Sequence, residues 1–244
     1  MSERRAVFFD FAGTLFSDRA LRDVHLGQLR FVGEAVGAAA SEDELRTSYR
    51  RGMGVAYRTV AARTYYRHRE LFGAAFAEMA KSLGGELDAA QIDDAVDRQY
   101  RATVEHAQLR ADCLDTLRRL RRRGLYVQIV SNIDTEQLDG LIGSLGLDTE
   151  IDAATSSDVA QSCKPDPAIY RWALQRAGCD ATNVLFVGDS PEHDVVGPRT
   201  LGMSTALLVA DRRDGWPGIA ACSPDFVIER LGQVVEIVER EMVA

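Results

Sequence analysis

Short apolar runs that alternate with helical segments restrict this chain to a small group of folds. The first run covers residues 5–9 and ends at Asp10, directly before a glycine turn. Similar runs, which end at or are followed by polar residues, recur at 125–132, 183–190, 205–210 and 225–229. Helical spacing of apolar residues is found at 112–123, 134–145, 167–177, 192–201 and 231–241. Strands that alternate with helices imply right-handed crossovers, so we expect an α/β fold with a doubly wound, Rossmann-like parallel sheet.

A long stretch after the first strand has a different character. Residues 17–108 carry no strand signal and show amphipathic helical patterns rich in Ala, Arg and Tyr. Glycines at 33–37, 52–54 and 84–85 predict the breaks between these helices. We therefore expect a core domain formed by residues 1–16 and 109–244 and a helical cap domain at 17–108. The cap should lie over the carboxyl edge of the sheet, because it begins at the turn that follows the first strand.

Charge and hydropathy exclude several classes of partner. The formal net charge of −8 gives no overall basic field that would attract nucleic acid or an anionic membrane. No apolar run reaches the ~18 residues needed to cross a bilayer, and the first residues lack the apolar core of a signal peptide. We therefore expect a cytoplasmic protein that has no nucleic-acid or membrane partner, with a homodimer as one expected assembly.

Polar residues with complementary chemistry follow three of the predicted strands, whose carboxyl ends share one edge of a parallel sheet. They are Asp10 and Thr14, then Ser131 and Asn132, then Asp189 and Asp194, with Lys164 ahead of a helix start. Carboxylates from two strand ends suit Mg²⁺, which takes one or two carboxylates together with water and substrate oxygens. A lysine, a hydroxyl and helix-start N–H groups suit an anion. Together these groups predict a pocket that handles a phosphoryl group.

The same residues resemble the four motifs of the haloacid dehalogenase superfamily of hydrolases with a helical, C1-type cap. The first motif, aspartate-x-aspartate-x-threonine, is matched at residues 10–14 except at its second aspartate, where this chain has Ala12. The second is matched by Ser131 and the third by Lys164 before Pro-Asp-Pro. The fourth, Gly-Asp-x-x-x-x-Asp, is matched at residues 188–194.

The resemblance implies a role for each matched residue. Asp10 would attack phosphorus and form an aspartyl-phosphate, with Lys164 and Ser131 as further catalytic groups. The groups that would bind substrate phosphate are Thr14, Ser131, Asn132 and Lys164. The groups that would bind or support Mg²⁺ are Asp10, the backbone carbonyl of Ala12, Asp189 and Asp194. The implied activity is that of a Mg²⁺-dependent phosphatase acting on a small phosphorylated metabolite.

Ala12 is the departure from that pattern. In the family's ordinary phosphatases an aspartate at this position protonates the leaving alkoxide and then activates water. General acid–base catalysis is worth roughly 10² to 10⁴ in rate, so alkyl phosphates should be poor substrates unless another group substitutes. We expect a preference for leaving groups that need no proton, such as acyl or aryl phosphates. Glu192 and His193 are candidate substitutes, although a surface-helix interpretation fits both.

Three alternatives remain open from the sequence. An Asp-x-Ala-Gly-Thr start also resembles phosphonoacetaldehyde hydrolase, which cleaves a carbon–phosphorus bond with a cap lysine, and the cap offers Lys81. A haloacid dehalogenase needs no metal, and the retained Asp189 and Asp194 speak against it. A non-catalytic module that binds a phosphorylated ligand is the third alternative.

Overall fold

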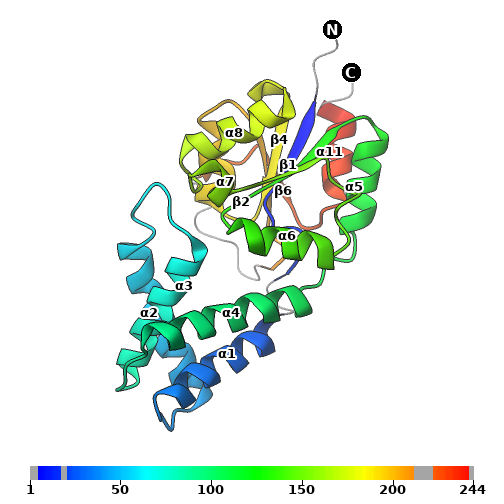
Figure 1. Ribbon diagram of the computed structural model, residues 1–244. Helices are drawn as coiled ribbons and strands as arrows, with labels where there is room; N and C mark the ends of the chain where they lie inside the picture. Colours follow the sequence, from blue (N-terminus) through cyan, green and yellow to red (C-terminus); the bar gives the residue numbers. More distant parts are fainter. Residues whose placement is uncertain (1–4, 18–20, 212–221, 242–244) are drawn as a thin grey trace.

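The computed structural model describes residues 5–17, 21–211 and 222–241 and contains a six-stranded parallel sheet in the order β3-β2-β1-β4-β5-β6 (Figure 1). The strands are β1 (Ala6–Phe9), β2 (Tyr126–Ser131), β3 (Ala153–Ser156), β4 (Val184–Gly188), β5 (Ser204–Leu208) and β6 (Phe226–Ile228). Every pairing is parallel, and β1 lies between β2 and β4. The predicted α/β class with a doubly wound parallel sheet is confirmed.

Alternate side chains of β1 supply two separate hydrophobic cores. Val7 and Phe9 face one side of the sheet, where they join the core that contains Leu117 and Val235. Phe8 faces the other side, where it joins the core that contains Tyr170. The helices of the first side are α5 (Cys113–Arg122), α6 (Thr135–Ser144) and α11 (Gln233–Glu241), and α8 (Pro167–Ala177) covers the second. Helices on both faces bury the central strands β1 and β4 completely, which explains their continuous apolar sequences, whereas β6 at the edge of the sheet is partly exposed.

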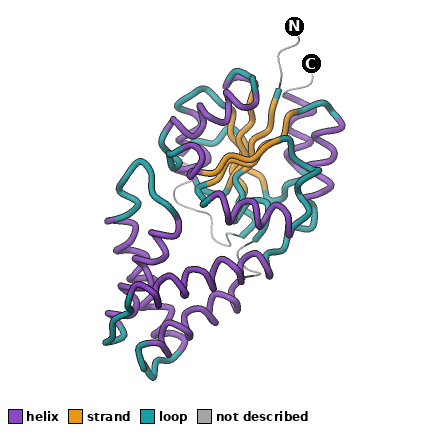
Figure 2. Tube along the Cα trace, in the orientation of Figure 1, coloured by secondary structure: helices purple, strands orange, loops and turns teal. Residues whose placement is uncertain are grey.

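Four helices between β1 and α5 form a separate bundle, which we call the helical insertion. They are α1 (Arg22–Ala35), α2 (Glu42–Thr59), α3 (His68–Ser82) and α4 (Ala89–His106). They have a core of their own, which includes Leu29, Phe76 and Val96. Figures 1 and 2 show the insertion beside the sheet, away from the N- and C-terminal ends of the chain. Within the described residues, no helix is both long and apolar enough to cross a membrane.

Two local predictions are wrong. The glycines at 52–54 do not break a helix, because both lie inside α2. A Cβ atom at Gly52 would lie 2.3 Å from the backbone oxygen of Ala75, so this glycine allows α2 and α3 to pack closely. The segment expected as one helix at 192–201 instead divides into a π-helix, η3 (Pro191–Val196), and the short α9 (Gly197–Arg199). Such π-turns are frequent at functional sites.

Candidate active site

Asp10 lies directly after β1, at the carboxyl edge of the sheet, and its side chain is fully engaged. Its backbone N–H donates to the Val187 carbonyl at 2.8 Å, which fixes it beside the end of β4. Oδ1 accepts hydrogen bonds from Lys164 Nζ at 2.7 Å and Ser131 Oγ at 3.2 Å, and Oδ2 accepts from Thr14 Oγ1 at 3.0 Å. These donors come from three separate chain segments and fix the plane of the carboxylate.

Lys164 connects two buried carboxylates. Its ammonium group donates to Asp10 Oδ1 and to Asp194 Oδ1, both at 2.7 Å, and the residue is only 4% exposed. Burial by itself would lower the pKa of Lys164. The charges and hydrogen bonds of Asp10 and Asp194 outweigh that effect and raise the pKa above its ordinary value. Lys164 is therefore held as a cation at the centre of the site.

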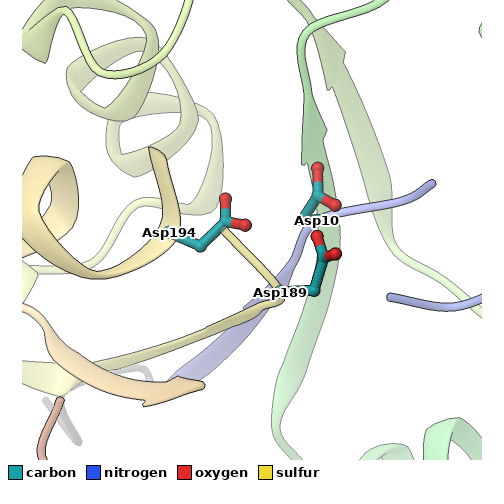
Figure 3. Close-up of side chains that lie close together, drawn as sticks. All are labelled: Asp10, Asp189 and Asp194. Atoms are coloured by element: carbon teal, nitrogen blue, oxygen red, sulfur yellow. The ribbon is translucent and has the colours of Figure 1, made fainter. Parts of the chain in front are cut away.

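Asp10, Asp189 and Asp194 form a carboxylate cluster at the ends of β1 and β4. Figure 3 shows the three side chains close together, Asp10 from the end of β1 and Asp189 and Asp194 from the stretch that follows β4, and one oxygen from each lies within 4.8 Å of the others. Asp194 is 1% exposed and accepts the Ser190 N–H at 2.9 Å. Burial raises the pKa of Asp194, the nearby Lys164 ammonium opposes this, and the Asp10 charge adds to the rise.

The donor set of this cluster fits a small divalent cation. Three carboxylates and one ammonium leave the group with two formal negative charges in excess when all are ionised. Oxygen ligands at this spacing are the kind that Mg²⁺ takes. Gly13 supports the same arrangement, because its φ of +82° favours glycine and a Cβ there would lie 2.7 Å from Asp189 Oδ2. The turn after Asp10 is therefore built around the Asp189 carboxylate.

Asn132 lies beside the site, where its amide holds the backbone of Lys164. Its Oδ1 accepts the Lys164 N–H at 2.6 Å, and its Nδ2 donates to the Lys164 carbonyl at 3.0 Å. This pair of bonds joins the end of β2 to the segment that carries the ammonium group. The contribution of Asn132, Ser131 and Thr14 to phosphate binding remains a prediction.

Position 12 offers no proton donor, and two histidines lie near the site from other segments. Ala12 is exposed at the turn after Asp10. His68 lies at the start of α3, and burial lowers its pKa to about 4. The charges of Asp134 and Asp10 partly offset this effect, whereas those of His193 and Lys164 add to it. Burial, followed by the charge of Lys164, likewise lowers the pKa of His193. The helical insertion thus brings an imidazole into the electrostatic environment of Asp10.

Arg110 is a second residue that sequence reasoning missed. It lies where the chain returns from the insertion, and its guanidinium donates to the backbone carbonyls of Gly13 and Thr14 and to the Asp211 carboxylate. It therefore supports the turn that follows Asp10. No motif or spacing marks this residue, since its partners, two main-chain oxygens and one carboxylate, lie about 100 positions away in the chain.

Lys81 lies far from the surface where the insertion meets the core. It occupies the last turn of α3, is exposed and pairs with Glu78 at 2.7 Å. At 1.5 Å rise per residue it lies roughly 20 Å along the helix from His68, the end of α3 that contacts the core. This placement speaks against Lys81 as the imine-forming lysine of a carbon–phosphorus hydrolase.

Comparison with known proteins places the chain in a family. The model of the haloacid dehalogenase-like hydrolases matches residues 4–202. The human haloacid dehalogenase-like hydrolase domain-containing protein 3 is 41% identical over 95 residues, which is 39% of this chain and 38% of that protein. Phosphoglycolate phosphatase of Pseudomonas putida is 30% identical over 62% of this chain and 58% of its own length. These alignments span less than two thirds of the relatives.

Other similarities extend over nearly the whole chain. An (S)-2-haloacid dehalogenase of a Pseudomonas species is 28% identical over 96% of this chain and 94% of its own. The magnesium-bound structure of the putative hydrolase YfnB from Bacillus subtilis superposes with a TM-score of 0.78 at 20% identity, covering 97% of this chain and 99% of that one. That likeness shows a common fold. By the family match over most of its length, this chain belongs to the haloacid dehalogenase-like hydrolases.

Proposed function

We propose that the protein is a Mg²⁺-dependent phosphatase that acts on a small phosphorylated metabolite through an aspartyl-phosphate at Asp10. The observation that carries this proposal is the cluster of Asp10, Asp189 and Asp194 with the Lys164 ammonium between two of its members. Such a cluster has an excess of negative charge that a divalent cation would balance. The similarity to phosphoglycolate phosphatase supports the same activity.

The contacts of Asp10 suit a nucleophile. A carboxylate oxygen of Asp10 would form a bond to phosphorus, while the bond from phosphorus to the leaving oxygen breaks and its electron pair stays with the leaving group. Lys164 and Ser131 hold Oδ1 and Thr14 holds Oδ2, so little reorientation is needed before attack. Water would then hydrolyse the aspartyl-phosphate and release inorganic phosphate.

The donors around Asp10 would also bind the phosphoryl oxygens. Lys164 and Ser131 already reach Asp10 and are placed to contact a group bonded to it. Magnesium bound by Asp10, Asp189 and the Ala12 carbonyl, with Asp194 as a ligand or a supporting carboxylate, would neutralise charge on the transferring phosphoryl group.

The exposed Ala12 defines the substrate class that we propose. Nothing at this position transfers a proton, so a leaving group that is stable as an anion should react fastest. We therefore propose acyl or aryl phosphates as better substrates than alkyl phosphates.

A screen of phosphorylated metabolites with Mg²⁺, repeated on the best substrate with EDTA, tests the proposal. Asp10→Asn should abolish phosphate release and leave the fold intact, since the amide keeps the size but is not a nucleophile. Asp139→Asn, an exposed change on α6, is the matched control and should keep full activity. Retention of more than a few per cent of activity by a pure Asp10→Asn preparation would remove Asp10 from the mechanism.

A haloacid dehalogenase is the second candidate. Two observations favour it: the similarity to an (S)-2-haloacid dehalogenase over almost the whole chain, and the absence of an acid at position 12. Halide release from 2-haloacids that persists in EDTA would establish this activity. Phosphate release that EDTA stops, with no halide release, would establish the phosphatase.

A further inference from the structure

Asp134 is the N-cap residue of α6, but its side chain does not cap that helix. Its backbone is extended, with φ −73° and ψ 143°, as is usual for an N-cap, yet its side chain makes no hydrogen bond to the first turn of α6. An aspartate at this position ordinarily accepts a backbone N–H from its own helix. Asp134 instead is fully buried and points to the helical insertion.

Within the part of the chain that the structure describes, the hydrogen-bond donors to the Asp134 carboxylate all come from the insertion. Oδ1 accepts the His68 N–H at 2.8 Å, and Oδ2 accepts the Arg69 N–H at 3.1 Å and the Tyr100 hydroxyl at 3.0 Å. Arg67 adds an ion pair, with its Nε 3.7 Å from Oδ2. His68 and Arg69 form the first turn of α3, so a carboxylate of the core caps a helix of the insertion.

These contacts belong to a larger attachment between insertion and core, which we call the docking segment (residues 64–69). The Thr64 carbonyl accepts the Cys163 N–H at 2.8 Å, and the Tyr65 hydroxyl donates to Asp158 Oδ1 at 2.6 Å. Cys163 directly precedes Lys164 in the chain. The docking segment is therefore bonded to two of the three chain segments that supply partners to Asp10, namely the end of β2 with the residues that follow it and the segment before α8.

Burial of an ionised carboxylate is costly unless hydrogen bonds replace its water. In this structure the replacement depends on the insertion being docked, because the donors to Asp134 named above belong to α3, α4 and the segment ahead of α3. The first turn of α6 has other acceptors, because Asp158 Oδ2 accepts the Thr135 N–H at 3.4 Å and the Asp134 carbonyl accepts the Gln137 N–H at 3.1 Å. Among the described residues, the hydrogen bonds of the Asp134 side chain therefore serve the insertion and not its own helix.

We propose that Asp134 is a positioning residue, which caps α3 across the boundary between core and insertion and so holds the docking segment against the chain segments that carry Ser131 and Lys164. Asp134 follows Ser131 by three residues, and Cys163, which bonds to Thr64, directly precedes Lys164. A shift of the docking segment would therefore be transmitted to both donors of Asp10 Oδ1. The kinetic part of this inference rests on the proposed function, whereas the structural part does not.

Asp134→Asn tests this cap, because asparagine keeps the size of the side chain and is as favourable as aspartate at the start of α6. Toward α3 it offers one carbonyl oxygen, and its amide protons face the remaining donors. The charge-assisted hydrogen bonds to the start of α3 are lost, so we expect amide hydrogen exchange in residues 66–72 to accelerate about ten-fold or more. Exchange in β1 and β4 should not change, and Asp139→Asn, an exposed change on α6, should have no effect.

Tyr100→Phe provides a milder variant that keeps the carboxylate and removes one donor. We expect a smaller acceleration, about three-fold, in the same residues. For the best phosphorylated substrate, both changes should raise KM more than they lower kcat, because they loosen the positions of Ser131 and Lys164, which would bind the phosphate. Unchanged exchange in residues 66–72 in both variants would overturn the inference. If Asp134→Asn accelerates exchange uniformly, including β1, it has disturbed the fold and Tyr100→Phe decides alone. A failure of the phosphatase proposal would remove the kinetic readout and leave the exchange result standing.

Discussion

An aspartate at position 12 is expected to raise hydrolysis of alkyl phosphates by ten-fold or more. Ala12 is exposed and follows Asp10 by two residues, at a turn whose next residue, Gly13, packs against Asp189. A substitution on this exposed side displaces no buried group, so the free energy of unfolding should change by no more than about 0.5 kcal/mol. The change therefore tests chemistry and not stability.

The size of the gain follows from the charges around position 12 in the loaded site. Mg²⁺ would balance the two negative charges that the carboxylate cluster and Lys164 carry in excess, so the substrate phosphate is the negative group that remains. Its charge raises the pKa of the new carboxyl group and favours the protonated form, which is the form that protonates a leaving alkoxide. Such a group can supply roughly 10² to 10⁴ in rate, and repulsion between its ionised form and the phosphate places the expected gain toward the lower end. Aryl phosphates should gain less.

The assay compares kcat/KM for an alkyl and an aryl phosphate in the parent protein, Ala12→Asp and Ala12→Asn. Ala12→Asn has the shape of the aspartate but no transferable carboxyl proton, so it should show no gain. If neither phosphate ester is hydrolysed faster by Ala12→Asp, with fold and Mg²⁺ binding intact, the pocket is not that of a phosphatase lacking its acid. A carbon–phosphorus hydrolase or a non-catalytic protein would then be favoured.

Three further changes have defined outcomes. Lys164→Met should lower the free energy of unfolding by about 3–5 kcal/mol without metal, because two buried carboxylates lose their cation, and Mg²⁺ should raise its melting temperature more than that of the parent. Gly13→Ala should weaken Mg²⁺ binding measured by calorimetry, because the added Cβ displaces the Asp189 carboxylate and the φ of +82° costs about 1–2 kcal/mol. The depressed pKa of His68 should give stability that is present above pH 6.5 and is lost as pH falls toward 4. This amounts to about 2 kcal/mol between pH 7 and 5 in denaturant titrations, and His68→Gln should abolish it.

The pattern of apolar residues was enough to predict the strands whose carboxyl ends carry the site residues. The five predicted strands are present, and the two that flank β1 carry Ser131 and lead to Asp189 as expected. The sixth, β3, was missed because its sequence, Ala-Ala-Thr-Ser, is short and weakly apolar. It pairs only at the edge of the sheet beside β2, so tertiary contacts and not local preference make it a strand.

The residues that sequence reasoning missed act through partners distant in the chain. Asp134 follows Ser131 and Asn132 at a helix start, where an aspartate is expected to cap its own helix. Its bonds to His68 and Tyr100 depend on how the insertion lies against the core, which no local pattern encodes. The prediction of a helix break at Gly52 was wrong for a similar reason. This glycine allows α2 and α3 to approach closely, which is a tertiary contact that no local pattern encodes.

The contacts of Arg110 tie both chain crossings between core and insertion to the turn after Asp10. Its guanidinium and its backbone N–H bond the segment returning from the insertion to Gly13, Thr14 and Leu15, and Phe16 pairs with Leu109 just beyond. The two crossings between core and insertion are thereby joined beside Asp10. Because Gly13 also packs closely against the Asp189 carboxylate, a displacement at either crossing would be transmitted directly to the carboxylate cluster.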